Sequence, residues 1–231
     1  MTSWPLAGAN AVSRELYRLL GVEKGVTAVI GSGGKTTLIA RLCRELPGTV
    51  IVCTSTHIFP PPELPLVTGA MEALPAAKLC AGTWAENGKL TAPVQDFEEL
   101  AQLADYVLVE ADGSRRLPLK AHLPHEPVIP VCANRTIQVL GLSGIGRPIA
   151  QAAHRPERYA ALCGASVHDL ATPERAARVL NAEALADLYL LNQADDLEKW
   201  EQGRELAARL NRPAVALCLQ ADEREIENSF L

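Results

Sequence analysis

The stretch Val29–Ala40, VIGSGGKTTLIA, passes from an apolar run through a glycine-rich turn into a helical pattern. This order of strand, loop and helix is typical of loops that bind nucleotide phosphates. The usual loop has four residues between its first glycine and a Gly-Lys-Thr triplet, whereas only two residues separate Gly31 from Gly34 here. The stretch predicts an α/β fold, and its short spacing raises the question of whether the loop still binds a nucleotide.

The residue types of the loop suit a phosphate. Glycines permit close approach of the backbone, and the unpaired N–H groups and the dipole at a helix N-terminus attract an anion. We expect Lys35 to reach the terminal phosphates and the Thr36 hydroxyl to bind Mg²⁺. The opposing interpretation is a glycine-rich turn that binds nothing. The residues predicted to contact ATP or GTP in this loop are Gly31, Ser32, Gly33, Gly34, Lys35, Thr36 and Thr37.

The short spacing has a parallel in another group of enzymes. The segment GSGGKTT, residues 31–37, resembles the compact GTxGKTT loop of the Mur ligases, with Ser32 in place of threonine. This resemblance implies that the missing residues need not mean a broken site. It points away from loops of the kinase and ABC types.

Two carboxylates follow a later apolar run, in the segment EADGSRRLPLK of residues 110–120. Glu110 and Asp112 lie on the same side of an extended chain, at the carboxyl end of a predicted strand, where open α/β sheets bind their ligands. We expect Asp112 to hold Mg²⁺ together with Thr36, and Glu110 to orient an attacking water molecule. The alternative is that a neighbouring arginine merely pairs with these carboxylates at the strand end.

Cations follow the carboxylates in the same segment. Arg115, Arg116 and Lys120 form a predicted anion-binding set, either for the nucleotide phosphates or for a phosphorylated second ligand. The choice between these two ligands stays open at this point.

Histidines occur in two further segments. The tetrapeptide TSTH, residues 54–57, follows a predicted strand, and His57 is a candidate to position the attacking water or contact the γ-phosphate. A hydroxyl-rich turn is an equally weighted alternative. In HLPHE, Pro124 keeps His122 and His125 from sharing a helical face, so we do not expect a zinc site there.

The tetrapeptide Asn192-Gln-Ala-Asp195 ends a late apolar run. It resembles the N-K-x-D base-reading motif of GTPases, in which the aspartate receives two donors from guanine, although Gln193 replaces the lysine. Asn192 and Asp195 are therefore candidate base contacts, and the choice between ATP and GTP stays open. In the alternative interpretation the segment caps the next helix, with Asp195 at the N-cap.

Composition narrows the class of protein. The 231 residues include 22 Lys and Arg against 27 Asp and Glu, and this formal net charge of −5 gives no electrostatic reason to expect nucleic acid. No apolar run approaches the roughly 20 residues of a membrane span, and the N-terminus lacks the layout of a secretory signal. We therefore expect a cytoplasmic protein without a membrane partner. The six cysteines show no CxxC spacing, which favours reduced, structural thiols.

Apolar runs alternate with helical patterns along the chain, which predicts a mostly parallel sheet flanked by helices. An Asn87-Gly88 pair predicts a small β-hairpin insertion at about residues 79–93. We expect residues 1–231 to form a single P-loop NTPase-like domain, a three-layer α/β sandwich. The predicted strands are 26–31, 48–55, 106–113, 136–142, 188–195 and 214–220, and the predicted helices are 11–20, 36–46, 94–104 and 196–210.

Four segments together resemble one family. They are AVIGSGGKTTLIARL, VIVCTSTHIF, VEADGSRRLPLKAHLPHEPVIP and AHRPERYAALCG, in this order. The chain is similar in them to the YqeC family of selenium-dependent hydroxylase accessory proteins. The resemblance implies a nucleotide-dependent helper in the maturation of molybdenum hydroxylases that carry labile selenium at their cofactor. Its implied partners are such a hydroxylase or the proteins that mature its molybdenum cofactor.

The leading hypothesis is a Mg²⁺-dependent nucleotide-binding protein that hydrolyses ATP or GTP. One alternative is a Mur-ligase-like transferase or ligase, in which the γ-phosphate passes to a small anionic acceptor held by the cations of residues 115–120. Another is a nucleotide-dependent switch with little turnover. No residue stands out as a selenium carrier, and Cys132, near Arg135, is the least implausible of the cysteines.

Overall fold

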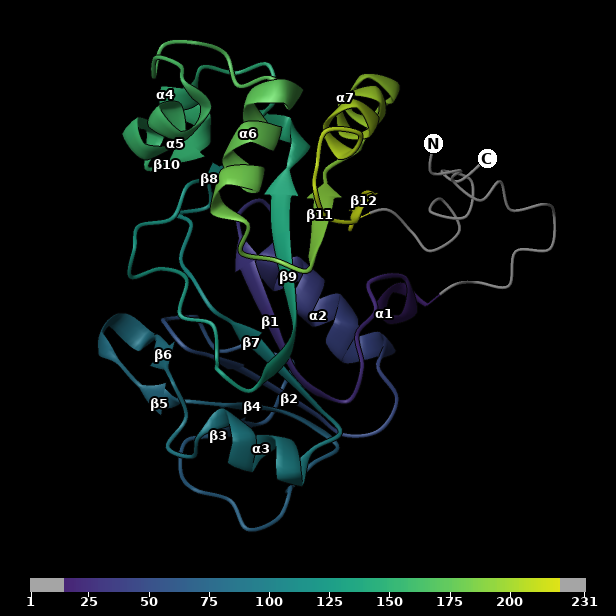
Figure 1. The fold of residues 1–231 in the computed structure, drawn as a ribbon. Coiled ribbons are helices and arrows are strands. Elements are labelled where there is room, and N and C mark those ends of the chain that lie inside the picture. Colours follow the sequence, from purple (N-terminus) through teal and green to yellow (C-terminus); the bar gives the residue numbers. More distant parts are fainter. Residues whose placement is uncertain (1–14, 221–231) are drawn as a thin grey trace, which may run out of the picture.

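The computed structural model describes residues 15–220, in which parallel strands form one large sheet (Figure 1). Every neighbouring pair of its strands is parallel, which confirms the predicted α/β class with a mostly parallel sheet. The eight strands of the described residues, in spatial order, are β12 (Ala214–Ala216), β11 (Leu188–Asn192), β9 (Ala133–Gly141), β1 (Gly25–Gly31), β7 (Tyr106–Glu110), β2 (Val50–Thr54), β4 (Lys78–Ala81) and β3 (Leu66–Val67).

Helices cover both faces of this sheet, as Figure 1 shows. On one face α1 (Leu16–Leu19) and α2 (Lys35–Glu45) pack against Val29 of β1 and its neighbours. Ala28 points the opposite way, into the cluster beneath α3 (Phe97–Leu103), because successive side chains of a strand alternate between faces. The other helices pack mainly against β9 and β11. They are α4 (Ile149–Ala152), α5 (Pro156–Cys163), α6 (Pro173–Glu183) and α7 (Leu197–Ala207).

The expected hairpin is present, but it begins later than predicted. Its strands, β5 (Thr83–Trp84) and β6 (Leu90–Thr91), pair antiparallel around the 3₁₀ turn η1 (Glu86–Gly88). Residues 79–81 belong instead to β4, which pairs with β2 in the main sheet. The short run KLCA was too brief to be separated from the hairpin by pattern alone. Two further two-residue strands, β8 (Leu119–Lys120) and β10 (Ala153–His154), pair with each other.

Most predicted elements end earlier than the apolar pattern suggested. The predicted strands 48–55, 106–113, 188–195 and 214–220 each lose residues at the carboxyl end, since their polar or irregular tails leave the sheet. The helix predicted at 94–104 starts only at Phe97, because Asp96 is its N-cap and forms a capping box with Glu99. The predicted helix 11–20 lies partly outside the described residues, and its described part is α1.

The order of strands changes direction at the carboxyl end of β1. After β1 the chain enters α2 on one face, whereas after β9, the neighbour of β1, it leads to the helices of the other face. Such a switch of direction between adjacent parallel strands is where open α/β sheets bind ligands. In residues 15–220 no helix is both long and apolar enough to cross a membrane.

Candidate functional site

The glycine-rich turn links the end of β1 at Gly31 to the start of α2 at Lys35. Gly31, Gly33 and Gly34 have φ angles of +90°, +80° and +135°, in the region that favours glycine. A Cβ atom on Gly31 would collide with the backbone carbonyl of Val139 in β9. The turn therefore needs glycine both for its conformation and for its close approach to the neighbouring strand.

The Lys35 side chain lies inside this turn and is only 3% exposed. Its Nζ donates to the carbonyl of Gly31 at 2.8 Å and lies 3.0 Å from Asp112 Oδ1 and 3.8 Å from Glu110 Oε1. The structure thus brings the predicted lysine and both predicted carboxylates together at one end of the sheet. This follows from topology, because β1 and β7 are adjacent and parallel.

Asp112 is fully buried and receives contacts from several directions. Its Oδ2 accepts from the Gly31 N–H at 2.9 Å and lies 2.9 Å from Lys120 Nζ and 2.8 Å from His122 Nε2. Burial acts to raise the pKa of Asp112, but the hydrogen bond to His122 and the charges of Lys35 and Lys120 outweigh it and hold the pKa below its ordinary value. Asp112 is therefore an ionised anchor for the turn.

His122 is buried between two carboxylates, an arrangement that the sequence did not reveal. Its Nδ1 lies 2.8 Å from Glu183 Oε2, and its backbone N–H donates to Glu183 Oε1 at 2.6 Å. Burial acts to lower the pKa of His122, but the bonds to Asp112 and Glu183 outweigh it and raise the pKa. Glu183 ends α6 and belongs to no motif, so no local signal could have identified it. Among residues 15–220 no group of His, Cys, Asp or Glu is arranged to hold a metal ion by itself.

Glu110 contacts the exposed hydroxyl of Thr36. The Thr36 Oγ1 donates to Glu110 Oε2 at 3.1 Å. Burial, the largest effect, raises the pKa of Glu110, against the opposing charge of Lys35. The structure thus pairs Thr36 with Glu110 and not with Asp112, because Asp112 is drawn toward the Gly31 N–H, Lys120 and His122. This departs from the pairing expected from the sequence.

The three predicted anion-binding cations differ in their burial. Lys120 is 1% exposed and bonds the Gly113 carbonyl at 2.6 Å as well as Asp112. Arg115 and Arg116 are exposed, and both have positive φ angles, of 52° and 61°. Among the described residues neither arginine pairs with Asp112, so the alternative of a simple arginine–carboxylate pair at the strand end is not seen.

The motif after β11 contacts the glycine-rich turn. Asn192 is buried, its Nδ2 donates to the Gly33 carbonyl at 2.8 Å, and its Oδ1 accepts from the Leu219 N–H at 2.9 Å. Asp195 is exposed, and the N-cap of α7 is Asp196, one residue later than the alternative interpretation placed it. The structure therefore ties Asn192 to the loop and leaves Asp195 open to solvent.

The remaining candidates lie around the end of β2 or in the core. Thr54 is buried and donates to the Glu110 carbonyl at 2.7 Å, which fixes the turn before His57. His57 is exposed and lines a cavity with Thr36 and Glu110. Burial raises the pKa of Cys132, which disfavours the reactive thiolate form.

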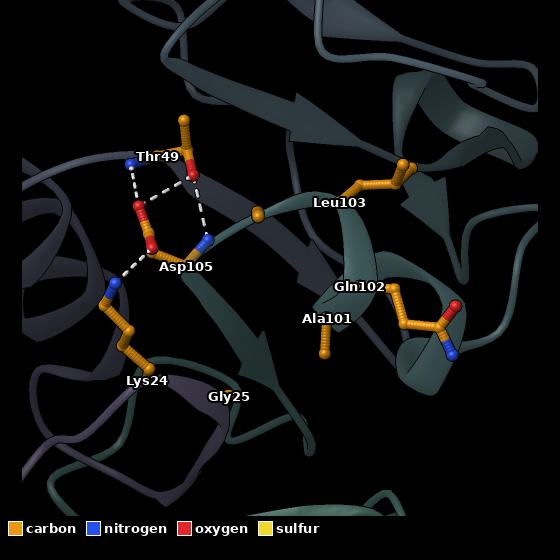
Figure 2. Close-up of a pocket in the computed structure, with 8 residues that line it drawn as sticks. Lys24, Gly25, Thr49, Ala101, Gln102, Leu103 and Asp105 are labelled. Carbon is orange, nitrogen blue, oxygen red and sulfur yellow. Dashed lines mark hydrogen bonds and ion pairs between the residues drawn. The ribbon is translucent and has the colours of Figure 1, made fainter.

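A second cavity, of about 440 Å³, lies at the opposite, amino-terminal end of the strands (Figure 2). There the Asp105 carboxylate accepts from the backbone N–H of Thr49 at 3.0 Å and from its hydroxyl at 3.1 Å, and pairs with Lys24 Nζ at 2.6 Å. These contacts join the starts of β2 and β7. We assign this cluster to stability, since it lies at the end of the sheet away from the glycine-rich turn.

Comparison with known proteins agrees with the resemblance seen in the sequence. A model of the family described as YqeC protein matches residues 27–157. "Uncharacterized protein YqeC" of Escherichia coli strain K12 is 36% identical over an alignment of 163 residues, and the match covers 63% of this chain and 64% of that protein. The matched range of the family includes the glycine turn, Glu110, Asp112 and His122, whereas Glu183 and Asn192 lie beyond it.

Proposed function

The chain belongs to the YqeC protein family, and from this premise and the site we propose that it binds and hydrolyses a Mg²⁺-nucleoside triphosphate. The observation that carries the proposal is the turn of residues 31–34, which presents the N-terminus of α2 and the ammonium of Lys35 at the switch point of the sheet. Backbone N–H groups, a helix dipole and a lysine are the elements that bind nucleotide phosphates.

Thr36 and Glu110 are the residues that fit Mg²⁺ best. Their side-chain oxygens lie 3.1 Å apart, and hydroxyl and carboxylate oxygens are the donors that Mg²⁺ prefers. Bound there, Mg²⁺ would neutralise charge on the phosphates. In this proposal Asp112 keeps Lys35 and the Gly31 N–H in place, and His57 positions the attacking water.

The base and the partner enzyme are extensions of the same proposal. Asp195 is exposed at the start of α7 and remains our candidate for contact with the base, whether adenine or guanine. The role in maturing selenium-dependent molybdenum hydroxylases rests on the family resemblance, and the cytoplasmic location on the sequence pattern alone. We expect the hydrolysis cycle to act on such a hydroxylase or on the proteins that mature its cofactor.

Calorimetric titration of Mg-ATP and Mg-GTP, with Lys35→Ala as the test variant, examines the proposal directly. Hydrogen bonds to charged groups contribute about 1.5–3 kcal/mol, so the variant should lose about ten-fold or more in affinity. Lys24→Ala is the matched control, because Lys24 is an exposed lysine at the other end of the sheet. Asp112 keeps Lys120 and His122 as partners in Lys35→Ala, so we expect the variant to fold.

Equal affinity of Lys35→Ala and wild type would refute the nucleotide site. The same variant tests the maturation role: a selenium-dependent hydroxylase produced with Lys35→Ala should lack the selenium-dependent activity that it has when produced with wild type. Full hydroxylase activity with the variant would show that maturation does not depend on nucleotide binding at this site.

A further inference from the structure

A cavity of about 550 Å³ opens directly beside the phosphate loop. Its lining includes Thr36 and Glu110, the pair that we propose for Mg²⁺, and continues along α2 past Ala40. This volume falls within the range of about 300–1,000 Å³ that is typical of small-molecule sites. An occupant would lie next to the terminal phosphate of the proposed nucleotide.

The walls of the cavity are apolar and stiff. Ile39 and Val52 form part of its floor and are themselves almost fully buried. The opposite wall is the loop after β2, where three consecutive prolines, residues 60–62, restrict the backbone. Ile58 and Leu90 exchange two backbone hydrogen bonds, of 3.0 and 2.7 Å, so the β5–β6 hairpin braces this loop. The cavity is therefore preformed.

Its charged groups include one more cation than carboxylate. Arg44, Lys89 and Arg116 line the cavity, against the carboxylates of Glu63 and Glu110. Glu110 is already within 3.8 Å of the Lys35 ammonium, whereas no hydrogen bond or ion pair within residues 15–220 uses the side chain of Arg116. This imbalance favours an anionic group in the occupant.

The backbone at the cavity mouth has an unusual conformation. Arg115 and Arg116 are consecutive non-glycine residues with positive φ, which is unfavourable for L-residues with long side chains. Of the two, Arg116 lines the cavity. Backbone strain of this kind concentrates at functional sites, where the surrounding structure maintains it.

We propose that this cavity binds a second ligand, a small organic anion with an apolar body. Its anionic group would contact Arg116 and Lys89, and its body would lie against α2 and the proline-rich loop. The hairpin then has a role in binding, because it supplies Lys89 and braces one wall. The place of this ligand beside a terminal phosphate rests on the proposed nucleotide function, whereas its binding does not require nucleotide.

The test uses two dyes with the same ring system as probes. The anion 8-anilinonaphthalene-1-sulfonate should bind saturably, with a rise in fluorescence, and the uncharged N-phenyl-1-naphthylamine should bind more weakly. Arg116→Gln should weaken binding of the sulfonate about three- to ten-fold and leave binding of the neutral dye nearly unchanged. Ala40→Leu, which fills the cavity from α2, should abolish saturable binding of both. Ala161→Leu, the same change on an exposed position of α5, should alter neither.

The outcome separates this inference from the proposed function. Lys35→Ala should still bind the neutral dye saturably, and Ala40→Leu should bind nucleotide normally in calorimetry. If wild type binds the dyes but binds neither nucleotide, only the nucleotide site is refuted. Dye affinity that is unaffected by both Ala40→Leu and Arg116→Gln, or binding of the neutral dye that is lost in Lys35→Ala, would overturn the second-ligand site. Circular dichroism of each variant confirms that the comparison is between folded proteins.

Discussion

At the scale of single residues, the site is a buried network of alternating charges. His122 contacts Asp112 and Glu183, and through Asp112 it faces the cations Lys35 and Lys120. Counting an imidazolium at His122, four cations face four carboxylates, so the network is neutral when His122 and all four carboxylates are charged. Its members are Lys35, Lys120, His122 and Arg155 with Glu110, Asp112, Glu126 and Glu183.

The network makes stability depend on pH through His122. Because its pKa is raised in the folded protein, the protonated form contributes stability that is fully present below the unfolded pKa of about 6.5 and is lost as the pH rises through the folded pKa. We expect the free energy of unfolding of wild type, relative to His122→Gln, to decrease as the pH rises above about 6.5. Urea unfolding of both proteins at several pH values between 6 and 9 measures this difference in the free energy of unfolding.

His125→Gln is the matched control, because His125 is exposed and belongs to the same HLPHE segment. Its stability should follow that of wild type at every pH. A constant difference between wild type and His122→Gln over the whole range would show that His122 does not change its charge there.

At the scale of elements, the sequence predicted turns and strands with a local pattern better than contacts between distant segments. The glycine turn was correctly located, because the positive φ angles of Gly31 and Gly33 are a local property that the run of glycines reveals, although their close contacts with Val139 and Gly141 are not. The pairing of His122 with Glu183 could not be predicted, since it joins positions 61 residues apart through tertiary packing alone. Strand β3, two residues long at the edge of the sheet, also lacks any periodic pattern.

A substitution at Asn192 distinguishes two roles for the end of β11, support of the glycine-rich turn and recognition of the base. Its side chain joins the Gly33 carbonyl to the Leu219 N–H, so Asn192→Ala leaves buried polar groups without their partners, at a cost of about 1–3 kcal/mol. If its main role is to hold the phosphate loop, the affinities for Mg-ATP and Mg-GTP should fall by similar factors. Calorimetry with both nucleotides makes the comparison. A loss restricted to Mg-GTP would instead show that Asn192 reads the base.

At the scale of the whole molecule, the two ends of the sheet have different tasks. The carboxyl end carries the glycine turn, the charge network and the second-ligand cavity, with positive φ angles at Gly31, Gly33 and Arg116. The amino end carries the Asp105 cluster, whose donors come from Thr49 and Lys24 (Figure 2). Parallel strands impose this division, because all their carboxyl ends meet at one edge.

This division predicts that Asp105→Asn lowers stability without changing nucleotide affinity. The hydrogen bonds from Lys24 and Thr49 lower the pKa of Asp105 to about 2. Its contribution is therefore fully present above the unfolded pKa of about 3.9 and is lost as the pH falls toward about 2. Unfolding of both proteins at pH 7 and at steps from pH 5 to pH 3 should show a difference that shrinks with acid, while calorimetry at pH 7 gives equal nucleotide affinities. A change in nucleotide affinity would mean that the sheet couples its two ends and that stability and binding are not separate in this fold.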